Sequence, residues 1–414
     1  MHAAPVSGAP VIPQMTGAPR QALLSGALRD EALQLAGRLN TTLRPVAAAG
    51  QGDASLASGS AGLAVCSGQF ARTRADQQAA EAALTHLEVA ADAVVTSTLS
   101  SSLYSGFVGV AWAVELVDRL LGSGGEGASG DIDDALARLL RRYPQDAPYD
   151  LTSGLTGLGV YALTCWPRLG AVQCALEVVE QLARRARHDR DGIFWVSPQR
   201  HDLPGRVDLG VAHGIAGVIA FLARAHRLGL ARQAARPLLD GAVSWLLAHL
   251  VDTPAGPTVP YLVAEGVAPA PARSAWCHGD PGLAIALLLA ARDVAEPAWA
   301  AVATGLAVRA AVRPPYQSGV ADAGLCHGSA GLAHLFNRLH QMTAEPVLAD
   351  AARFWIERTL ELCGTAGPAY SGTGLLEGAA GVALAMEAAS TTAEPVWDQM
   401  LLVSAAGIPG VQAQ

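Results

Sequence analysis

The chain has 414 residues, of which 51% are hydrophobic and 15% charged, and its net charge is −8 at pH 7. This composition excludes a disordered chain, and a negative net charge without a long Lys/Arg block argues against a nucleic-acid-binding protein. The length fits either one large closed unit or two to three ordinary domains, so internal repeats have to decide between them.

No segment has the pattern of a signal peptide or a membrane span. The first twenty residues are rich in Ala, Pro and Gly, and we expect residues 1–20 to form a flexible arm. Apolar runs such as Gly282 to Ala291 stop after about ten residues, whereas a membrane-spanning helix needs about 20. We therefore expect a cytoplasmic protein without a transmembrane segment, with peripheral attachment to a membrane-associated biosynthetic complex as one option.

A Gly-x-x-Gly element that opens an apolar stretch recurs seven times along the chain. The pairs are Gly59/Gly62, Gly106/Gly109, Gly154/Gly157, Gly214/Gly217, Gly279/Gly282, Gly328/Gly331 and Gly378/Gly381. Successive first glycines lie 47 to 65 residues apart. This spacing leaves room for two helices and their turns in each repeat.

Most segments between the glycine motifs offer first an apolar stretch and then an amphipathic one. Asp131 to Leu140 opens with acidic residues suited to a helix N-terminus, and Pro346 to Leu362 opens with a proline suited to a first helical turn. No strand-like alternation is long enough to build a sheet. We therefore predict an all-α fold: an α/α barrel of about seven helical hairpins in two concentric layers, formed by residues 21–414 as a single domain. An open solenoid is the alternative.

Two of the intervals between glycine motifs are longer than the others. They hold the Pro- and Gly-containing segments 189–206 and 251–273. Long loops of this kind are often functional, and both lead into motifs with histidine or cysteine. We expect them to form walls of a substrate cleft.

The residue before each first glycine is polar in all seven repeats. These residues are Ser58, Ser105, Ser153, His213, His278, His327 and Glu377. Helix capping explains the three serines, because a polar side chain just before a helix can bond to free backbone amides. Capping does not explain the histidines or the neighbouring cysteines, since His is not a favoured cap and Cys lacks a good acceptor.

Cys277 and Cys326 occupy the same position in successive repeats, two residues before the first glycine, and His327 follows Cys326 directly. Equivalent positions in adjacent repeats of a barrel lie side by side, so we expect these three side chains to meet. Two thiolates and one imidazole are a ligand set of catalytic zinc sites, which keep the fourth position open. The alternative is two buried cysteines and a core histidine. The repeat register favours the metal, one Zn²⁺ per chain.

The other four cysteines have no such register and are assigned to packing. They are Cys66, Cys165, Cys174 and Cys363.

The motif Trp276-Cys277-His278-Gly279, followed by Cys326-His327-Gly328 within seven glycine-marked repeats, resembles the lanthionine synthetase C-like family. The resemblance covers nearly the whole chain. It implies an α/α toroid whose zinc is held by the two cysteines and by His327.

The resemblance also implies that Asp150, His213 and Arg273 lie near the zinc. Taken alone, Asp150 fits the start of a helix, His213 a cap or core position, and Arg273 a surface loop. His278 departs from the family, which commonly has tyrosine after the first zinc cysteine. Its role is open, and it is kept among the catalytic candidates.

The function implied by the resemblance is that of a zinc-dependent lanthipeptide cyclase. Such an enzyme adds cysteine thiols of a dehydrated precursor peptide to dehydroalanine or dehydrobutyrine, forming (methyl)lanthionine rings. His213 is the predicted general acid because imidazole titrates near neutrality, with Asp150 assisting and Arg273 organising the charged site. The repeats occupy almost the entire chain, so a separate protein is expected to dehydrate the substrate.

Two other functions fit parts of the pattern. Zinc-dependent prenyltransferases also combine a helical barrel with an activated thiolate, but their lipid pockets should be rich in aromatic residues, which make up only 5% of this chain. A noncatalytic LanC-like protein would hold a thiol such as glutathione on the metal. Ring formation in a dehydrated peptide separates a cyclase from both.

Overall fold

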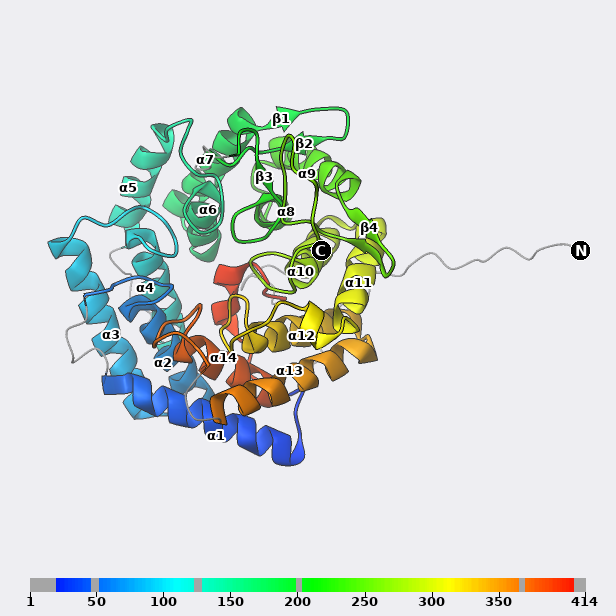
Figure 1. Ribbon diagram of the computed structural model, residues 1–414. Helices are drawn as coiled ribbons and strands as arrows, with labels where there is room; N and C mark the ends of the chain where they lie inside the picture. Colours follow the sequence, from blue (N-terminus) through cyan, green and yellow to red (C-terminus); the bar gives the residue numbers. More distant parts are fainter. Residues whose placement is uncertain (1–19, 46–51, 123–128, 199–202, 365–368, 406–414) are drawn as a thin grey trace, which may run out of the picture.

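The computed structural model describes residues 20–45, 52–122, 129–198, 203–364 and 369–405. The predicted flexible arm, residues 1–20, lies outside this part of the chain except for Arg20. The described part contains fourteen α-helices, α1 to α14, and three small two-stranded sheets. Figure 1 shows the helices arranged as two rings about a common centre.

The inner ring consists of the seven helices that begin at the glycine motifs. They are α2 (Ser60–Arg74), α4 (Phe107–Leu121), α6 (Leu155–Thr164), α8 (Ile215–Arg227), α10 (Asp280–Val294), α12 (Ser329–Thr343) and α14 (Ala379–Ser390). Each packs against the next, and α14 packs against α2. Because the ring closes on itself, the predicted barrel is confirmed and the open solenoid is wrong.

The outer ring consists of longer, mostly amphipathic helices. They are α1 (Gly26–Leu43), α3 (Gln77–Thr96), α5 (Ser129–Arg141), α7 (Leu169–Arg185), α9 (Arg232–Ala248), α11 (Pro297–Ala311) and α13 (Pro346–Gly364). Helix α3, for example, buries Ala79, Ala83, His86 and Ala90 on one face. This spacing of three or four residues turns a single apolar stripe toward the inner ring.

Helix α1 completes the outer ring in a way that the glycine repeat did not predict. It precedes the first glycine motif, yet it packs against α13 and α14 at the end of the chain. Arg29 Nε donates to the Ser390 carbonyl at 2.9 Å, which ties the two ends of the ring together. The last inner helix is therefore covered by the first helix of the chain.

The first glycine of each motif is itself the N-cap of the following helix. At Gly279 the φ angle is +114°, and a Cβ atom would lie 1.8 Å from the Arg273 carbonyl oxygen. The backbone of the preceding loop thus folds directly over the start of α10, which only glycine permits.

The prediction that the serines before the glycines act as helix caps is wrong. None of the three helices has a side-chain cap. Ser58 Oγ donates to Asp53 Oδ2 at 2.7 Å, and the hydroxyls of Ser105 and Ser102 lie 2.8 Å apart. These serines hydrogen-bond within the preceding loop because the chain turns back on itself before each inner helix.

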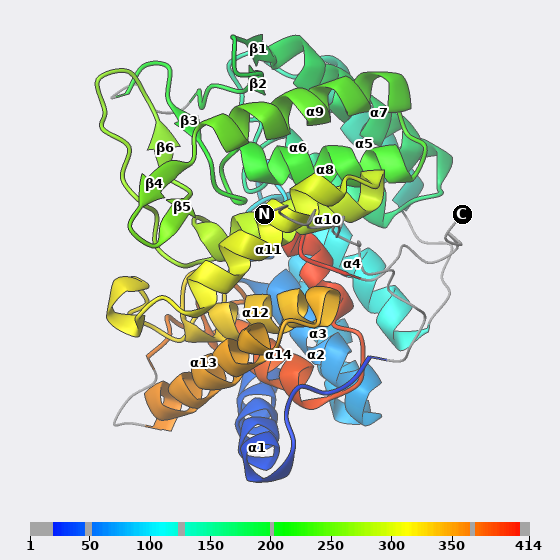
Figure 2. The same ribbon diagram turned by 90° about the vertical axis from the view of Figure 1, so that its right-hand side faces the viewer.

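The three sheets lie in the two long intervals and are antiparallel. They pair β1 (Arg187–His188) with β2 (Ile193–Phe194), β3 (Val207–Asp208) with β6 (Leu262–Val263), and β4 (Val251–Thr253) with β5 (Gly256–Thr258). The pairing of β3 with β6 joins one long interval to the other. It fixes both beside the loops that lead into α8 and α10, on the side of the molecule seen at the left of Figure 2.

The end of the described chain fills the centre of the ring. There the 3₁₀ helix η3 (Val396–Leu401) lies against α6, and Figure 1 shows this red segment inside the inner ring. Trp276 Nε1 donates to the Leu401 carbonyl at 2.9 Å, and the Tyr104 hydroxyl donates to the Met400 carbonyl at 2.8 Å. This segment therefore supports the loop that carries Cys277.

In the described part of the chain, no helix is both long and apolar enough to span a membrane.

Candidate active site

Three residues from two neighbouring repeats meet at one end of the barrel. The Sγ atoms of Cys277 and Cys326 and a ring nitrogen of His327 lie within 4.8 Å of one another. Both cysteines are in the loops before inner helices. The backbone N–H of Trp276 donates to the Cys326 carbonyl at 3.2 Å. Adjacent loops therefore run side by side, as the repeat register predicted, and bring together three donor atoms that could hold a metal ion.

The neighbours of Cys277 favour a thiolate at this residue. The Cys326 thiol beside it lowers its pKa, and His278 and His327 act in the same direction against the effect of burial. Cys277, together with burial, raises the pKa of Cys326. Cys277 also raises the pKa of His327. A thiolate is the form in which cysteine binds a metal, so the group fits a cation.

A carboxylate that the sequence analysis missed lies beside His327. This carboxylate is that of Asp322. Its Oδ2 atom is 3.6 Å from His327 Nε2, and its Oδ1 atom accepts the backbone N–H of Gly324 at 2.7 Å. Carboxylates in this position commonly orient histidines that bind metals. In the sequence, nothing distinguished Asp322 from other loop acids.

His213 and Asp150 form a pair next to Cys277, Cys326 and His327. These three residues, which could hold a metal ion, are called the metal-ligating group below. His213 Nδ1 lies 3.0 Å from Asp150 Oδ2 and 2.9 Å from the Thr152 hydroxyl oxygen. The other Asp150 oxygen accepts the Ser153 N–H at 2.7 Å. Because a carboxylate only accepts, Nδ1 carries the hydrogen and Nε2 remains for chemistry. The Ala212 backbone N–H donates to the Cys277 carbonyl at 3.4 Å, which places His213 beside Cys277.

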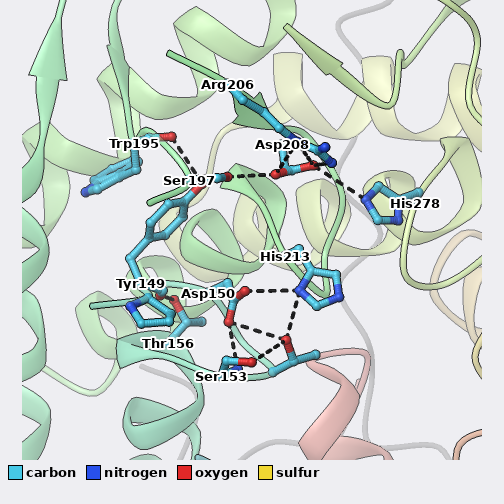
Figure 3. A network of polar contacts seen from close by, with 12 residues as sticks. Tyr149, Asp150, Ser153, Thr156, Trp195, Ser197, Arg206, Asp208, His213 and His278 are labelled. Atoms are coloured by element: carbon cyan, nitrogen blue, oxygen red, sulfur yellow. Dashed lines mark hydrogen bonds and ion pairs between the residues drawn. The ribbon is translucent and has the colours of Figure 1, made fainter. Parts of the chain in front are cut away.

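A second polar network surrounds His278 (Figure 3). Asp208 Oδ2 accepts the Ser197 hydroxyl at 2.7 Å, and both Asp208 oxygens accept Arg206 Nε at 3.0 Å. His278 Nε2 lies 3.9 Å from Asp208 Oδ1. Burial alone would raise the pKa of Asp208, but these contacts outweigh it and lower the pKa to about 2. For His278, burial alone would lower the pKa, but Asp208 and Cys277 outweigh it and raise the pKa to about 9.

The two networks face one cavity of about 270 Å³, whose lining includes Asp150, His213, Asp208 and His278. The two imidazole rings are 6.1 Å apart between centroids. The long interval 189–206 contributes Ser197, Pro198 and Arg206 to the lining. It therefore forms a wall of this cavity, whereas segment 251–273 contributes none of the described lining residues; that the cavity is a substrate cleft stays a prediction. The sequence analysis missed Arg206 and Asp208 as site residues, and their position in or next to a long interval was the only signal.

Arg273 also lies at the metal-ligating group, as the resemblance implied. Its positive charge lies close enough to Cys326 and His327 to lower the pKa of each, which opposes the larger effects that raise them. Its backbone N–H donates to the Tyr261 hydroxyl at 3.0 Å. Tyr261 comes from the second long interval and packs against the His278 ring at 5.7 Å between centroids.

The remaining cysteines pack in the protein, as predicted. Cys66, Cys165 and Cys174 are buried, and Cys363 is half-buried against the core. Burial raises the pKa of all four thiols. These residues therefore resemble inert core cysteines.

Comparisons with known proteins agree with this architecture. A model of the family described as lanthionine synthetase C-like protein matches residues 50–402. Among solved structures, nisin cyclase superposes with a TM-score of 0.73 and 18% sequence identity, covering 91% of this chain and 97% of the nisin cyclase chain. At that identity, the structural match supports the toroidal fold.

Proposed function

The chain belongs to the lanthionine synthetase C-like family, and from this premise we propose that it is a lanthipeptide cyclase. The proposed reaction adds cysteine thiols of a dehydrated precursor peptide to dehydroalanine or dehydrobutyrine. One observation carries the proposal. A Cys/Cys/His group suited to zinc lies beside a cavity lined by a His–Asp pair. The likeness of the fold to that of a protein named nisin cyclase supports it.

Cys277, Cys326 and His327 would hold the zinc, one ion per chain. Catalytic zinc sites with such a ligand set keep one position open for a substrate. Zinc bound there would supply a Lewis acid that lowers the pKa of a substrate thiol from its usual value of about 8.5. Cys277 and Cys326, as two thiolates, would balance the charge of the cation and so leave the substrate sulfur electron-rich enough to attack.

His213 would move the proton. The substrate S–H gives its proton to His213 Nε2, the sulfur bonds to the β-carbon, and the electron pair of the C=C bond moves to form an enolate. The α-carbon then takes a proton from His213 Nε2, while Asp150 holds Nδ1 and fixes the ring. The net result is addition of S–H across the double bond, without any oxidant. Arg273 would stabilise the negative charge of the site.

Ring formation with a dehydrated precursor peptide tests this function. Because the addition does not change peptide mass, the readout is loss of thiols that can be alkylated. With zinc present, the wild-type protein is expected to remove these thiols one by one. In His213→Asn we expect ring formation to slow by 10²- to 10⁴-fold with zinc still bound. A wild-type rate in that variant would refute the role of His213 as proton donor.

The same experiment addresses the alternative function, a noncatalytic zinc protein that binds thiols such as glutathione. The metal-ligating group would serve either function, because both require a thiol at the fourth zinc position. Binding of a thiol to the zinc protein without ring formation in the dehydrated peptide would favour the binder.

We also propose that a separate dehydratase prepares the substrate. An unmodified precursor peptide is therefore expected to remain unchanged with this protein alone, and conversion of it to ringed product would contradict the proposal. The cytoplasmic location and the single domain over residues 21–414 stay predictions.

A further inference from the structure

Asp208 is a buried carboxylate with a fixed position. Its side chain is 4% exposed, at the end of strand β3, and it accepts hydrogen bonds from Arg206 Nε and from the Ser197 hydroxyl. Bonds between charged groups in a buried setting are strong and directional. The carboxylate therefore has little freedom to turn.

The His278 ring is held between this carboxylate and an aromatic ring. Its Nε2 faces Asp208, while Tyr261 packs against the ring. Both partners come from the β3–β6 region, where Asp208 pairs with Leu262 and the Leu209 N–H donates to the Tyr261 carbonyl at 3.2 Å. One small sheet thus determines the surroundings of His278.

The segment that follows strand β3 packs closely against the loop that carries Cys277 and His278. A Cβ atom at Gly210 would lie 2.0 Å from the Cys277 carbonyl oxygen and 2.8 Å from His278 Cδ2. The segment 208–213 therefore passes directly over Cys277 and His278. It carries Asp208 at one end and His213 at the other, so both carboxylate–histidine pairs face the same cavity.

We propose that Asp208 is a positioning residue that acts through His278, and that the two form a second carboxylate–histidine pair opposite Asp150–His213. The proposal rests on the proposed function, because it assigns a role to a residue of the same site. Asp208 lies beside His278, with its Oδ1 atom 3.9 Å from His278 Nε2.

The role of the pair is to direct a hydrogen bond onto the sulfur of Cys277. His278 directly follows Cys277 in the chain and acts on its thiol, and Asp208 Oδ1, 3.9 Å from His278 Nε2, would fix the position of the ring. Groups that hold metal ligands in this way tune the electron density of the ligand and the strength of metal binding. Asp208 itself does not need to touch the peptide.

Metal binding by the purified protein tests the pair without any peptide. Co²⁺ in place of zinc reports on the ligand sulfurs through the sulfur-to-cobalt charge-transfer absorption, and competition with a chelator gives the affinity for Zn²⁺. Asp208→Asn is expected to shift the absorption and to weaken zinc binding by about tenfold or more. In a His278→Phe background, Asp208→Asn is expected to have no further effect, because the residue through which it acts is gone.

Ser197→Ala provides a second variant in case loss of the charge leaves Arg206 unpaired and prevents folding. It removes one hydrogen bond to Asp208 and keeps the ion pair, so a smaller change in the same direction is expected, again abolished by His278→Phe. No change in either variant, or an equal change with and without His278, would overturn the proposal. A protein that shows this coupling but forms no thioether rings would refute the cyclase function alone.

Discussion

At the scale of single residues, Gly210 controls how closely the two halves of the site approach. A methyl group there would overlap the Cys277 carbonyl oxygen, which is backbone and cannot rotate away. We predict that Gly210→Ala displaces the Cys277 loop, costs about 1–3 kcal/mol of stability and weakens zinc binding by about tenfold or more. Chemical denaturation and a zinc competition assay measure these effects.

Gly130 in α5 provides the matched control. A Cβ atom at that glycine meets nothing within 4 Å. Gly130→Ala is therefore expected to leave zinc binding as in the wild type and to stabilise the helix slightly. Equal zinc affinity in the Gly210 and Gly130 variants would show that the predicted overlap is relieved without moving the loop.

His86 on α3 gives the protein a stability that depends on pH. Its side chain is fully buried, and burial lowers its pKa to about 4, although the Leu43 backbone acts in the opposite direction. In the unfolded chain its pKa is about 6.5, so between these values the unfolded chain binds more protons. The stability due to neutral His86 is thus fully present above pH 6.5 and falls as the pH drops toward 4.

We expect the melting temperature of His86→Leu to fall less between pH 7 and pH 4.5 than that of the wild type. Thermal unfolding at the two pH values measures the difference. His188 is exposed, so His188→Gln should behave like the wild type in this comparison. A His86 variant with the full acid-induced loss would assign that loss to other groups.

The residues that could be predicted from sequence are those with a repeat register or a family motif. Cys277 and Cys326 stood out because they share a position in successive repeats, and the structure brings them together with His327. Asp208 and Asp322 could not be found in this way. A single acid in a loop has no periodic signal, and its role depends on which histidine the fold places beside it.

At the scale of elements, an ion pair ties outer helix α5 to the loop between α6 and α7. Buried Asp133 accepts Arg168 Nε at 2.6 Å and the Tyr161 hydroxyl at 2.9 Å. We predict that Asp133→Asn costs about 2 kcal/mol, below the roughly 3–5 kcal/mol of a fully buried pair, because the Arg168 side chain is 31% exposed.

Chemical denaturation of Asp133→Asn and Asp134→Asn measures this effect. Asp134 is the next residue of the same helix and is exposed, so its variant should stay within about 0.5 kcal/mol of the wild type. Equal stability of the two variants would show that the Asp133 pair contributes nothing to the attachment of α5.

The helices were predictable because their apolar residues repeat every three or four positions. The strands were not, since each has only two or three residues, too few for an alternating pattern. Strands β3 and β6 form because segments from different intervals meet above the barrel. The same reasoning explains why β3, which carries Asp208, gave no signal in the sequence.

At the scale of the whole molecule, the glycine period indicated a ring of hairpins but not how the ring closes. The closing contact joins α1 to α14 across almost the full length of the chain. The central position of η3 was equally hidden, because no glycine motif lies between Gly381 and the start of η3. Contacts between distant segments depend on the completed ring, and a local pattern cannot specify them.

The metal content of the purified protein tests the central claim most directly. We predict one zinc ion per chain in the wild type and in Cys363→Ala, whose half-buried thiol serves as the control. We expect zinc to be lost or bound much more weakly in Cys277→Ala, Cys326→Ala and His327→Ala. A wild-type protein without zinc, or zinc that persists unchanged in those three variants, would contradict the proposed site and the cyclase function that depends on it.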